Sequence, residues 1–192
     1  MPPHPLWTEL ADLTLAQIEL LHRHLDLLLE HNQRLNLTAI RDRQLGEVRH
    51  TADALTLLPH LGDASSIADL GSGGGVPGVP LAIALPHRRF TLIDSVAKKM
   101  DACRAMIDTL GLSNVDVIAD RAENVDRKFD AVVARAVAPM KKLVAWSKPL
   151  LNDGGVLLAL KGRTGPEEAA PFKQATVHRS PVGDGVIIEL RH

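Results

Sequence analysis

Apolar positions follow a helical period in the first part of the chain. From Thr14 to about Arg34 they recur every three or four residues, and Thr14 with Gln17 has the form of a capping box. The same spacing predicts a second helix over Leu45 to Leu58, which ends before a proline. We therefore expect residues 1–60 to form an N-terminal helical extension.

From residue 61 onward, short apolar runs typical of strands alternate with helical patterns. The expected strands are Ile67 to Leu70, Phe90 to Asp94, Val115 to Ala119, Ala131 to Ala134 and Val156 to Leu160. The expected helices are Val79 to Leu85, Ala97 to Leu110 and Met140 to Leu151. This alternation predicts a doubly wound, mostly parallel α/β sheet over residues 61–192, packed with the extension as one globular unit.

Two turn-rich stretches complete the expected sheet. Asn152 to Gly155 predicts a turn into the fifth strand. Ala175 to Val182 and Val186 to Leu190, joined by a Gly-Asp-Gly turn, predict an antiparallel hairpin that closes one edge of the sheet.

Composition and charge narrow the function classes. The formal charge of −1 neither indicates nor excludes a nucleic-acid partner, so such a contact must come from local basic patches. The single cysteine, Cys103, excludes disulfides and cysteine-rich metal sites, and we expect it to be a small buried side chain. His22, His24 and His31 do not share a helix face at ligand spacing, so we expect no metal. The chain shows no signal peptide and no membrane span, which favours the cytoplasm.

The most informative stretch is Ser66 to Gly78, where an apolar run meets an acid and then five glycines. Glycines between a strand and a helix indicate a sharp turn that approaches a ligand closely. Two frames fit. Gly73, Gly75 and Gly78 match the dinucleotide pattern GxGxxG, whereas Asp69-x-Gly71-x-Gly73-x-Gly75 is an alternative frame.

Charged residues follow three of the expected strands at the same sheet edge. Asp94 ends the second strand, where its carboxylate could accept hydrogen bonds from a ribose or could cap the next helix. Asp120 to Glu123 follow the third strand and Arg135 follows the fourth. The structural alternative for these two charged loops is surface ion pairing.

Several of these motifs together resemble one bacterial family. The Asp69 frame resembles motif I of class I S-adenosylmethionine-dependent methyltransferases, which have a Rossmann-like fold. The full set falls in the order and spacing of the small-subunit ribosomal RNA guanine-N7 methyltransferase G family, also called glucose-inhibited division protein B. The matching segments are Asn36 to Ile40, Gly71 to Pro80, Asp94 with Lys98 and Lys99, Arg121 to Glu123, Arg135 with Ala136, and Lys161 with Gly162. Ala134 departs from the family, which commonly has Ser there.

The resemblance implies S-adenosylmethionine as the cofactor and a set of residues that hold it. These are Gly71, Gly73, Val76, Asp94, Ala122, Glu123 and Arg135, with Ala122 and Glu123 near the adenine and Asp94 included by its position in the fold. The substrate-side candidates are Asn36, His50 and Arg135, and for His50 the alternative is an exposed histidine on a helix.

The implied reaction transfers a methyl group from S-adenosylmethionine to N7 of a guanine in 16S ribosomal RNA, free or in the small ribosomal subunit, by a protein expected to be a monomer. N7 carries a lone pair, so no base has to remove a proton, and alignment of the reactants supplies the acceleration. The alternatives are a methyltransferase acting on a small molecule or another RNA base, an NAD-dependent enzyme, and an RNA-binding scaffold without activity.

Overall fold

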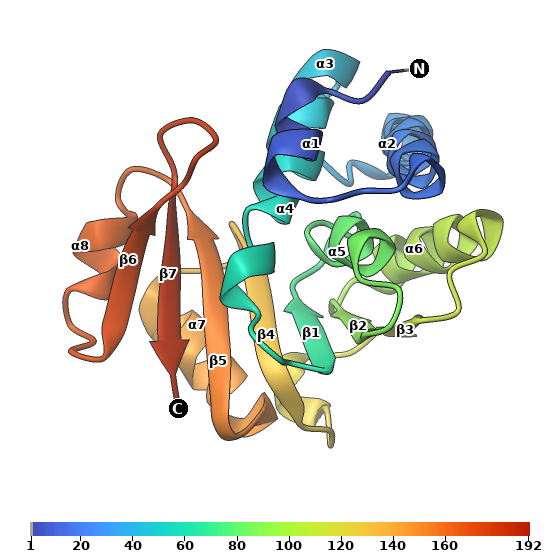
Figure 1. Ribbon diagram of the computed structural model, residues 1–192. Helices are drawn as coiled ribbons and strands as arrows, with labels where there is room; N and C mark the ends of the chain where they lie inside the picture. Colours follow the sequence, from blue (N-terminus) through green and yellow to red (C-terminus); the bar gives the residue numbers. More distant parts are fainter. Residues whose placement is uncertain (1) are drawn as a thin grey trace.

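A computed structural model describes residues 2–192 and shows a twisted sheet with helices on both faces (Figure 1). The strand order is β3-β2-β1-β4-β5-β7-β6. The strands are β1 Ser66–Leu70, β2 Arg89–Ile93, β3 Val115–Ile118, β4 Phe129–Arg135, β5 Leu151–Lys161, β6 Ala175–Arg179 and β7 Val186–Arg191. The pairs from β3 through to β5 are parallel, and β7 runs antiparallel to both β5 and β6. The predicted doubly wound sheet and its C-terminal hairpin are confirmed.

Helices before and between the strands cover the two faces of the sheet. The α-helices are α1 Pro5–Leu10, α2 Leu15–Leu35, α3 Arg43–Gly46, α4 Asp53–Leu55, α5 Gly78–Ala84, α6 Ala97–Leu110, α7 Met140–Ser147 and α8 Gly165–Ala169. The other helical turns are the π-helix η1 Glu47–Ala52 and the 3₁₀ turns η2 Leu58–His60, η3 Ala122–Asn124 and η4 Lys148–Leu150. In Figure 1, α5 and α6 cover one face, and α7 and α8 lie on the other.

The N-terminal helices form a further layer over α5 and α6 (Figure 1). The predicted capping box of α2 is present, because Thr14 accepts a hydrogen bond from the Gln17 amide and the Gln17 side chain accepts one from Thr14 N. Leu21 and Leu28 of α2 are buried together with Trp7 of α1, whose indole nitrogen donates to the Glu47 carbonyl oxygen at 2.9 Å. Burial of apolar surface is the main force that holds this layer to the sheet.

Two expected elements were wrong in their bounds. The single helix over Leu45 to Leu58 is instead α3, a π-helical turn, α4 and a 3₁₀ turn that contains Pro59. In a π turn each backbone N–H donates to the carbonyl oxygen five residues before it instead of four. This shifts the period of the apolar positions. The turn expected at Asn152 to Gly155 lies inside β5, because these residues are tied to the chain end by hydrogen bonds between Gly154 N and His192 O and between His192 N and Gly155 O.

The order of the strands decides where a ligand can bind. β1 lies between β2 and β4, so the chain turns to opposite sides after β1 and after β4. In open sheets of this kind the carboxyl ends of the strands at this switch point form a crevice. The glycine-rich loop after β1, Asp94 after β2 and Arg135 at the end of β4 all lie at this edge.

Candidate functional site

The loop after β1 is a tight backbone structure that requires glycine. Gly71, Gly73 and Gly75 have φ angles of +70°, +55° and +83°. Gly71 N and Ser72 N both donate to the Ile93 carbonyl oxygen, at 2.8 and 3.1 Å, which anchors the loop to the end of β2. A Cβ atom at Gly71 would lie 2.5 Å from the Val137 side chain. The loop therefore approaches the segment after β4 more closely than any residue with a side chain allows.

Asp69, at the end of β1, joins this loop to α5. Its side chain is fully buried, and Oδ2 accepts a hydrogen bond from Gly78 N at 2.8 Å at the start of that helix. Oδ1 has no partner among the described residues. Burial raises the pKa of Asp69 to about 7, although the Gly78 bond and the Arg135 charge favour the ionised form.

The Asp94 carboxylate accepts hydrogen bonds from the backbone of the glycine-rich loop and of the segment just before α6. Its Oδ2 accepts from Gly73 N at 3.0 Å, and its Oδ1 accepts from Val96 N at 2.9 Å. The residue at the N-cap of α6 is Val96, so the helix-capping alternative for Asp94 is replaced by a turn just before the helix. The ribose role of Asp94 stays a prediction.

Two cavities meet at the switch point. The larger, of about 890 Å³, includes Gly71, Gly73, Val76, Asp94, Arg135 and His50 among its lining residues. The smaller, of about 290 Å³, is lined by Asp94 with Ala122, Glu123, Ser95, Trp146 and others. Gly71, Asp94 and Val137 line both cavities, so the two adjoin. The structure thus brings all seven expected cofactor residues to one connected space.

Arg135, His50 and Thr38 form a hydrogen-bonded chain in the wall of the larger cavity. Arg135 donates to His50 Nδ1 at 3.0 Å and to the Arg49 carbonyl oxygen. Because a guanidinium only donates, His50 Nδ1 accepts, and Nε2 carries the hydrogen that it donates to Thr38 Oγ1 at 2.9 Å. Thr38 Oγ1 also accepts from Ile40 N at 3.1 Å.

His50 is neutral and fully engaged in this chain. Its side chain is only 1% exposed, which excludes the alternative of an exposed helix histidine. Burial, together with the Arg135 charge, lowers the pKa of His50 to about 3. Both ring nitrogens already have partners, so His50 orients Arg135 and Thr38 rather than accepting a proton from a substrate.

Asp53 and Asp69 are the acidic groups whose charges act on Arg135. Burial raises the pKa of Asp53 to about 6, while the charges of Arg49 and Arg135 act in the opposite direction. Burial also lowers the pKa of Arg135, with Asp53 and Asp69 opposing this shift. The hydrogen bonds to His50 Nδ1 and to the Arg49 carbonyl oxygen hold the guanidinium in position, while Asp53 and Asp69 act on it through their charge.

The expected substrate-side residue Asn36 lies apart from these groups. It is exposed, ends α2 in the left-handed conformation at φ 48°, and is not among the residues that line the two cavities. The residues after it, from Leu37 to Ile40, do line the larger cavity. Buried Asn32 holds that segment, because its Oδ1 accepts from Thr38 N at 2.9 Å.

Sequence reasoning missed several residues of the site. Asn32 and Thr38 were not singled out, although an asparagine among the apolar positions of α2 is a signal of a structural hydrogen bond. Asp53 and the hairpin turn from Ser180 to Val186 were also missed, and both line the larger cavity. The turn is far from the glycine loop in sequence, so no local pattern connects them.

Lys161 and Cys103 have structural partners. Lys161 donates to the Ala138 carbonyl oxygen at 2.5 Å and to Glu168 at 2.8 Å, which ties the end of β5 to α8. Cys103 is buried as expected, with Sγ 3.4 Å from the Gly73 carbonyl oxygen. Burial raises the pKa of Cys103 to about 12, so the thiol is not a nucleophile.

The family comparison covers most of the chain. Residues 17–182 match the family model GidB, described as rRNA small subunit methyltransferase G. The chain is 42% identical over 165 residues to a ribosomal RNA small subunit methyltransferase G of Chromobacterium violaceum, covering 85% of this chain and 79% of that protein. A protein of the same name from Neisseria meningitidis serogroup B is 41% identical over 152 residues, or 79% of this chain and 73% of that protein.

Solved structures give the same fold. A methyltransferase from Geobacter sulfurreducens superposes with a TM-score of 0.65 at 20% identity, covering 86% of this chain and 87% of that one. An O-methyltransferase from Bacillus cereus, solved in complex with SAH, has a TM-score of 0.61 at 20% identity, covering 88% and 90%. Within residues 2–192, no helix is both long and apolar enough to span a membrane.

Proposed function

This chain belongs to the rRNA small subunit methyltransferase G family, S-adenosylmethionine-dependent methyltransferases of ribosomal RNA, and from that premise we propose that it methylates N7 of a guanine in 16S ribosomal RNA. The observation that carries the proposal is the position of the family's motif residues. Gly71, Asp94, Glu123 and Arg135 come from four separate segments that follow or end β1, β2, β3 and β4, and they line two adjoining cavities.

The residues of these cavities fit S-adenosylmethionine. The smaller cavity, of about 290 Å³, is lined by Ala122 and Glu123, and the Asp94 carboxylate, which lines both cavities, can accept hydrogen bonds from ribose hydroxyls. The glycine loop leaves room where a Cβ at Gly71 would collide, so the methionine portion can lie against backbone. When bound, the cofactor supplies an electrophilic methyl group on its sulfonium.

Guanine N7 carries no proton, so the reaction requires no polar group of the site to act as a base, including Asp53 in the lining of the larger cavity. His50 is neutral, and both of its ring nitrogens are engaged. Asp69 is fully buried beneath the loop and does not line either cavity. Guanine N7 has a free lone pair and needs no base, so holding the base in line with the methyl group is the task left to the protein, and good alignment is worth about 7 to 11 kcal/mol.

Cationic side chains around the larger cavity support a phosphate-bearing substrate. Arg49, Lys99 and Arg163 line it together with Arg135, and Lys161 also lines it, but the Lys161 ammonium is paired with Glu168. Lys98, Lys141 and Lys142 are exposed near the same edge of the sheet, at the starts of α6 and α7. Because N7 lies in the deep, narrow major groove of A-form RNA, we infer that the target guanine lies in a loop or a distorted region.

The test is a transfer assay with substrates of both classes. Purified protein with labelled S-adenosylmethionine is given 16S ribosomal RNA or small subunits from cells that lack the modification, or a pool of small metabolites. We expect label in the RNA as N7-methylguanosine after digestion. Label only in small metabolites would favour the alternative methyltransferase, and calorimetric binding of NAD in place of S-adenosylhomocysteine would contradict the cofactor assignment.

We also propose that the protein acts as a monomer in the cytoplasm, where ribosomal RNA is found. The residues that the family resemblance assigns to the cofactor, such as Gly71, Asp94 and Glu123, come together within one copy of the chain, which supports a complete site in a single copy. Analytical ultracentrifugation of the purified protein tests this, with one species at monomer mass as the expected result and a stable dimer as the contradicting one.

A further inference from the structure

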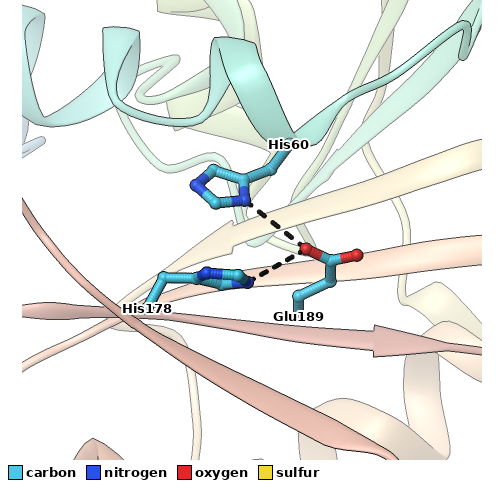
Figure 2. Close-up of side chains that lie close together, drawn as sticks. All are labelled: His60, His178 and Glu189. Atoms are coloured by element: carbon cyan, nitrogen blue, oxygen red, sulfur yellow. Dashed lines mark hydrogen bonds and ion pairs between the residues drawn. The ribbon is translucent and has the colours of Figure 1, made fainter.

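Three potential metal ligands from separate segments meet away from the two cavities. Figure 2 shows His60 of η2, His178 of β6 and Glu189 of β7 directed toward one another. Glu189 Oε2 lies 3.4 Å from His60 Nδ1 and 3.1 Å from His178 Nε2. The two imidazole rings are also close, with centroids 4.4 Å apart.

The sheet register places two of the three ligands. Thr176 pairs with Glu189 and His178 pairs with Ile187, so His178 and Glu189 are diagonal neighbours on one face of the hairpin. The 3₁₀ turn that follows α4 lies over this face and brings His60 to them. All three side chains are 16 to 34% exposed, so the cluster is partly buried but open to solvent.

The spacing suits a small tetrahedral ion. The three ligand atoms lie within 4.8 Å of one another. With metal–nitrogen and metal–oxygen bonds of about 2.0 to 2.1 Å, neighbouring ligands of tetrahedral zinc are roughly 3.3 Å apart. The two measured separations from Oε2 lie on either side of that value. Two imidazoles with one carboxylate are also a common zinc ligand set that leaves a fourth position for water.

Arg191 holds the carboxylate in a suitable orientation. Its guanidinium donates to Glu189 Oε1 at 2.8 Å, which leaves Oε2 directed at the two histidines. Partial burial opposes ionisation, but the Arg191 charge and the bonds from His60 and His178 hold the pKa of Glu189 below its usual range. Partners of this kind, which bond a ligand's other oxygen, fix ligand geometry in metal sites.

We propose that His60 Nδ1, His178 Nε2 and the Glu189 carboxylate form a zinc-binding site with three protein ligands. Zn²⁺ binds the lone pairs of His60 Nδ1 and His178 Nε2 in neutral imidazoles, so in the bound state the ring hydrogen of each histidine lies on its other nitrogen. The bound ion joins η2 to the C-terminal hairpin. Because Ser180, Val182 and Gly185 of the hairpin line the larger cavity, the ion also braces one wall of the functional site. No local sequence pattern indicates this site, because its ligands come from η2 and from both strands of the C-terminal hairpin.

Calorimetric titration with ZnCl₂ tests the site directly. Tag-free, chelator-treated wild-type protein should bind one equivalent, and Co²⁺ should give the visible absorption of a tetrahedral complex. His178→Ala and Glu189→Gln should each weaken zinc binding at least about 10-fold. His87→Ala, which changes an exposed histidine outside the cluster, is the matched control and should bind like the wild type.

Thermal unfolding gives a second readout. Zinc should raise the unfolding temperature of the wild type and of His87→Ala, because the ion binds the folded chain, but not that of His178→Ala. Circular dichroism of each variant checks that it folds. If His178→Ala does not fold, the comparison is made with Glu189→Gln. No stoichiometric binding by the wild type, or equal affinity in the wild type and both cluster variants, would overturn the proposal.

Discussion

Arg135 lines the larger cavity and donates a hydrogen bond to the neutral His50. Among the residues of the site, its replacement should lower activity most. Its guanidinium donates to His50 Nδ1 and to the Arg49 carbonyl oxygen, so its loss leaves the buried His50 ring without the donor that holds it. The family resemblance assigns Arg135 to both the cofactor and the substrate side, and its place in the larger cavity is consistent with that prediction.

Arg135→Ala should lower methyl transfer to ribosomal RNA at least about 10-fold, since one lost donor in an active site costs 10²-fold or more in many enzymes. The free energy of unfolding should fall by about 1 to 3 kcal/mol, because His50 Nδ1 is left unpaired. Steady-state assays and urea denaturation measure the two effects. Arg127→Ala, an exposed ion-pair residue, should change neither. Wild-type turnover in Arg135→Ala would contradict the assignment.

Asp69 predicts a distinct pH dependence. Its pKa is about 7 in the folded protein and 3.8 for an aspartate in the unfolded chain. Between these two pH values the folded protein therefore binds more protons than the unfolded chain does. This contribution to stability is fully present below pH 3.8 and is lost as pH rises through 7. Relative to Asp69→Asn, the wild type should lose up to about 1.4 kcal/mol per pH unit within this window.

Urea denaturation at pH 5, 6, 7 and 8 measures this difference, which isolates Asp69 from the other titrating groups. The difference should level off above about pH 7, where the folded-state carboxyl is ionised. Asp116→Asn, at an exposed carboxylate, serves as the control and should run parallel to the wild type. Parallel curves for Asp69→Asn and the wild type would exclude a raised pKa.

At the scale of elements, the loop between β1 and α5 depends on glycine for two separable reasons. Gly71 has a positive φ and also contacts the Val137 side chain. Gly111, which ends α6, has a similar φ of +67° but open space around a Cβ atom. The pair therefore separates backbone strain from steric exclusion.

Gly71→Ala should weaken the binding of S-adenosylhomocysteine at least about 10-fold, because Val137 or the loop must move and both border the two cavities. Gly111→Ala should cost about 1 kcal/mol of stability from its positive φ and leave binding unchanged. Isothermal calorimetry with both variants provides the comparison. Equal binding by the two variants would mean that the close approach at Gly71 has no role in ligand recognition.

The elements that sequence predicted well are those with a strong local pattern. The bounds of α6, Ala97–Leu110, were predicted to the residue because a glycine stops a regular apolar face. The region from Leu45 to Leu58 was wrong, because its π turn is stabilised by tertiary contacts that a periodic pattern does not contain. His50 lies in that turn, so the burial that makes it neutral was beyond sequence reasoning.

In the candidate site, too, the residues that follow a strong local pattern were predicted and those placed by tertiary contacts were not. Gly71, Asp94 and Arg135 follow strands, and the parallel sheet alone brings strand ends to one edge. Asn36 was expected near the pocket because it begins the family motif that runs to Ile40, but its own side chain is exposed at the end of α2. Asn32 holds the motif segment instead, through a hydrogen bond that only the folded α2 can direct.

At the scale of the whole molecule, the near-neutral chain places cations around one edge of the sheet. Lys141 and Lys142 begin α7 just beyond the carboxyl end of β4, on the side of the cavities. Lys128 precedes β4 and lies near the opposite end of that strand. Binding to a folded RNA should therefore depend on the first pair and not on the second site.

Replacing both Lys141 and Lys142 by Ala should weaken ribosomal RNA binding and reduce the slope of log affinity against log salt by about 1 to 2, because each phosphate contact releases counterions. Turnover at saturating RNA should stay near that of the wild type. Filter binding at salt concentrations between about 50 and 200 mM gives the slope, because the affinity of such complexes falls steeply over this range. Lys128→Ala is the control, and an unchanged slope in the double variant would remove α7 from the RNA interface.

We propose that this site methylates an unprotonated ring nitrogen by positioning alone, so the methylated atom should be N7 of guanine. Small subunits from cells that lack the modification are treated with the protein and S-adenosylmethionine, and their 16S ribosomal RNA is reduced with borohydride and cleaved with aniline, which cuts at N7-methylguanosine. We predict one enzyme-dependent cleavage site, at a guanine in a loop or distorted region, that is lost with Arg135→Ala. Methyl incorporation without cleavage, as on an exocyclic amine or a ribose, would contradict the account.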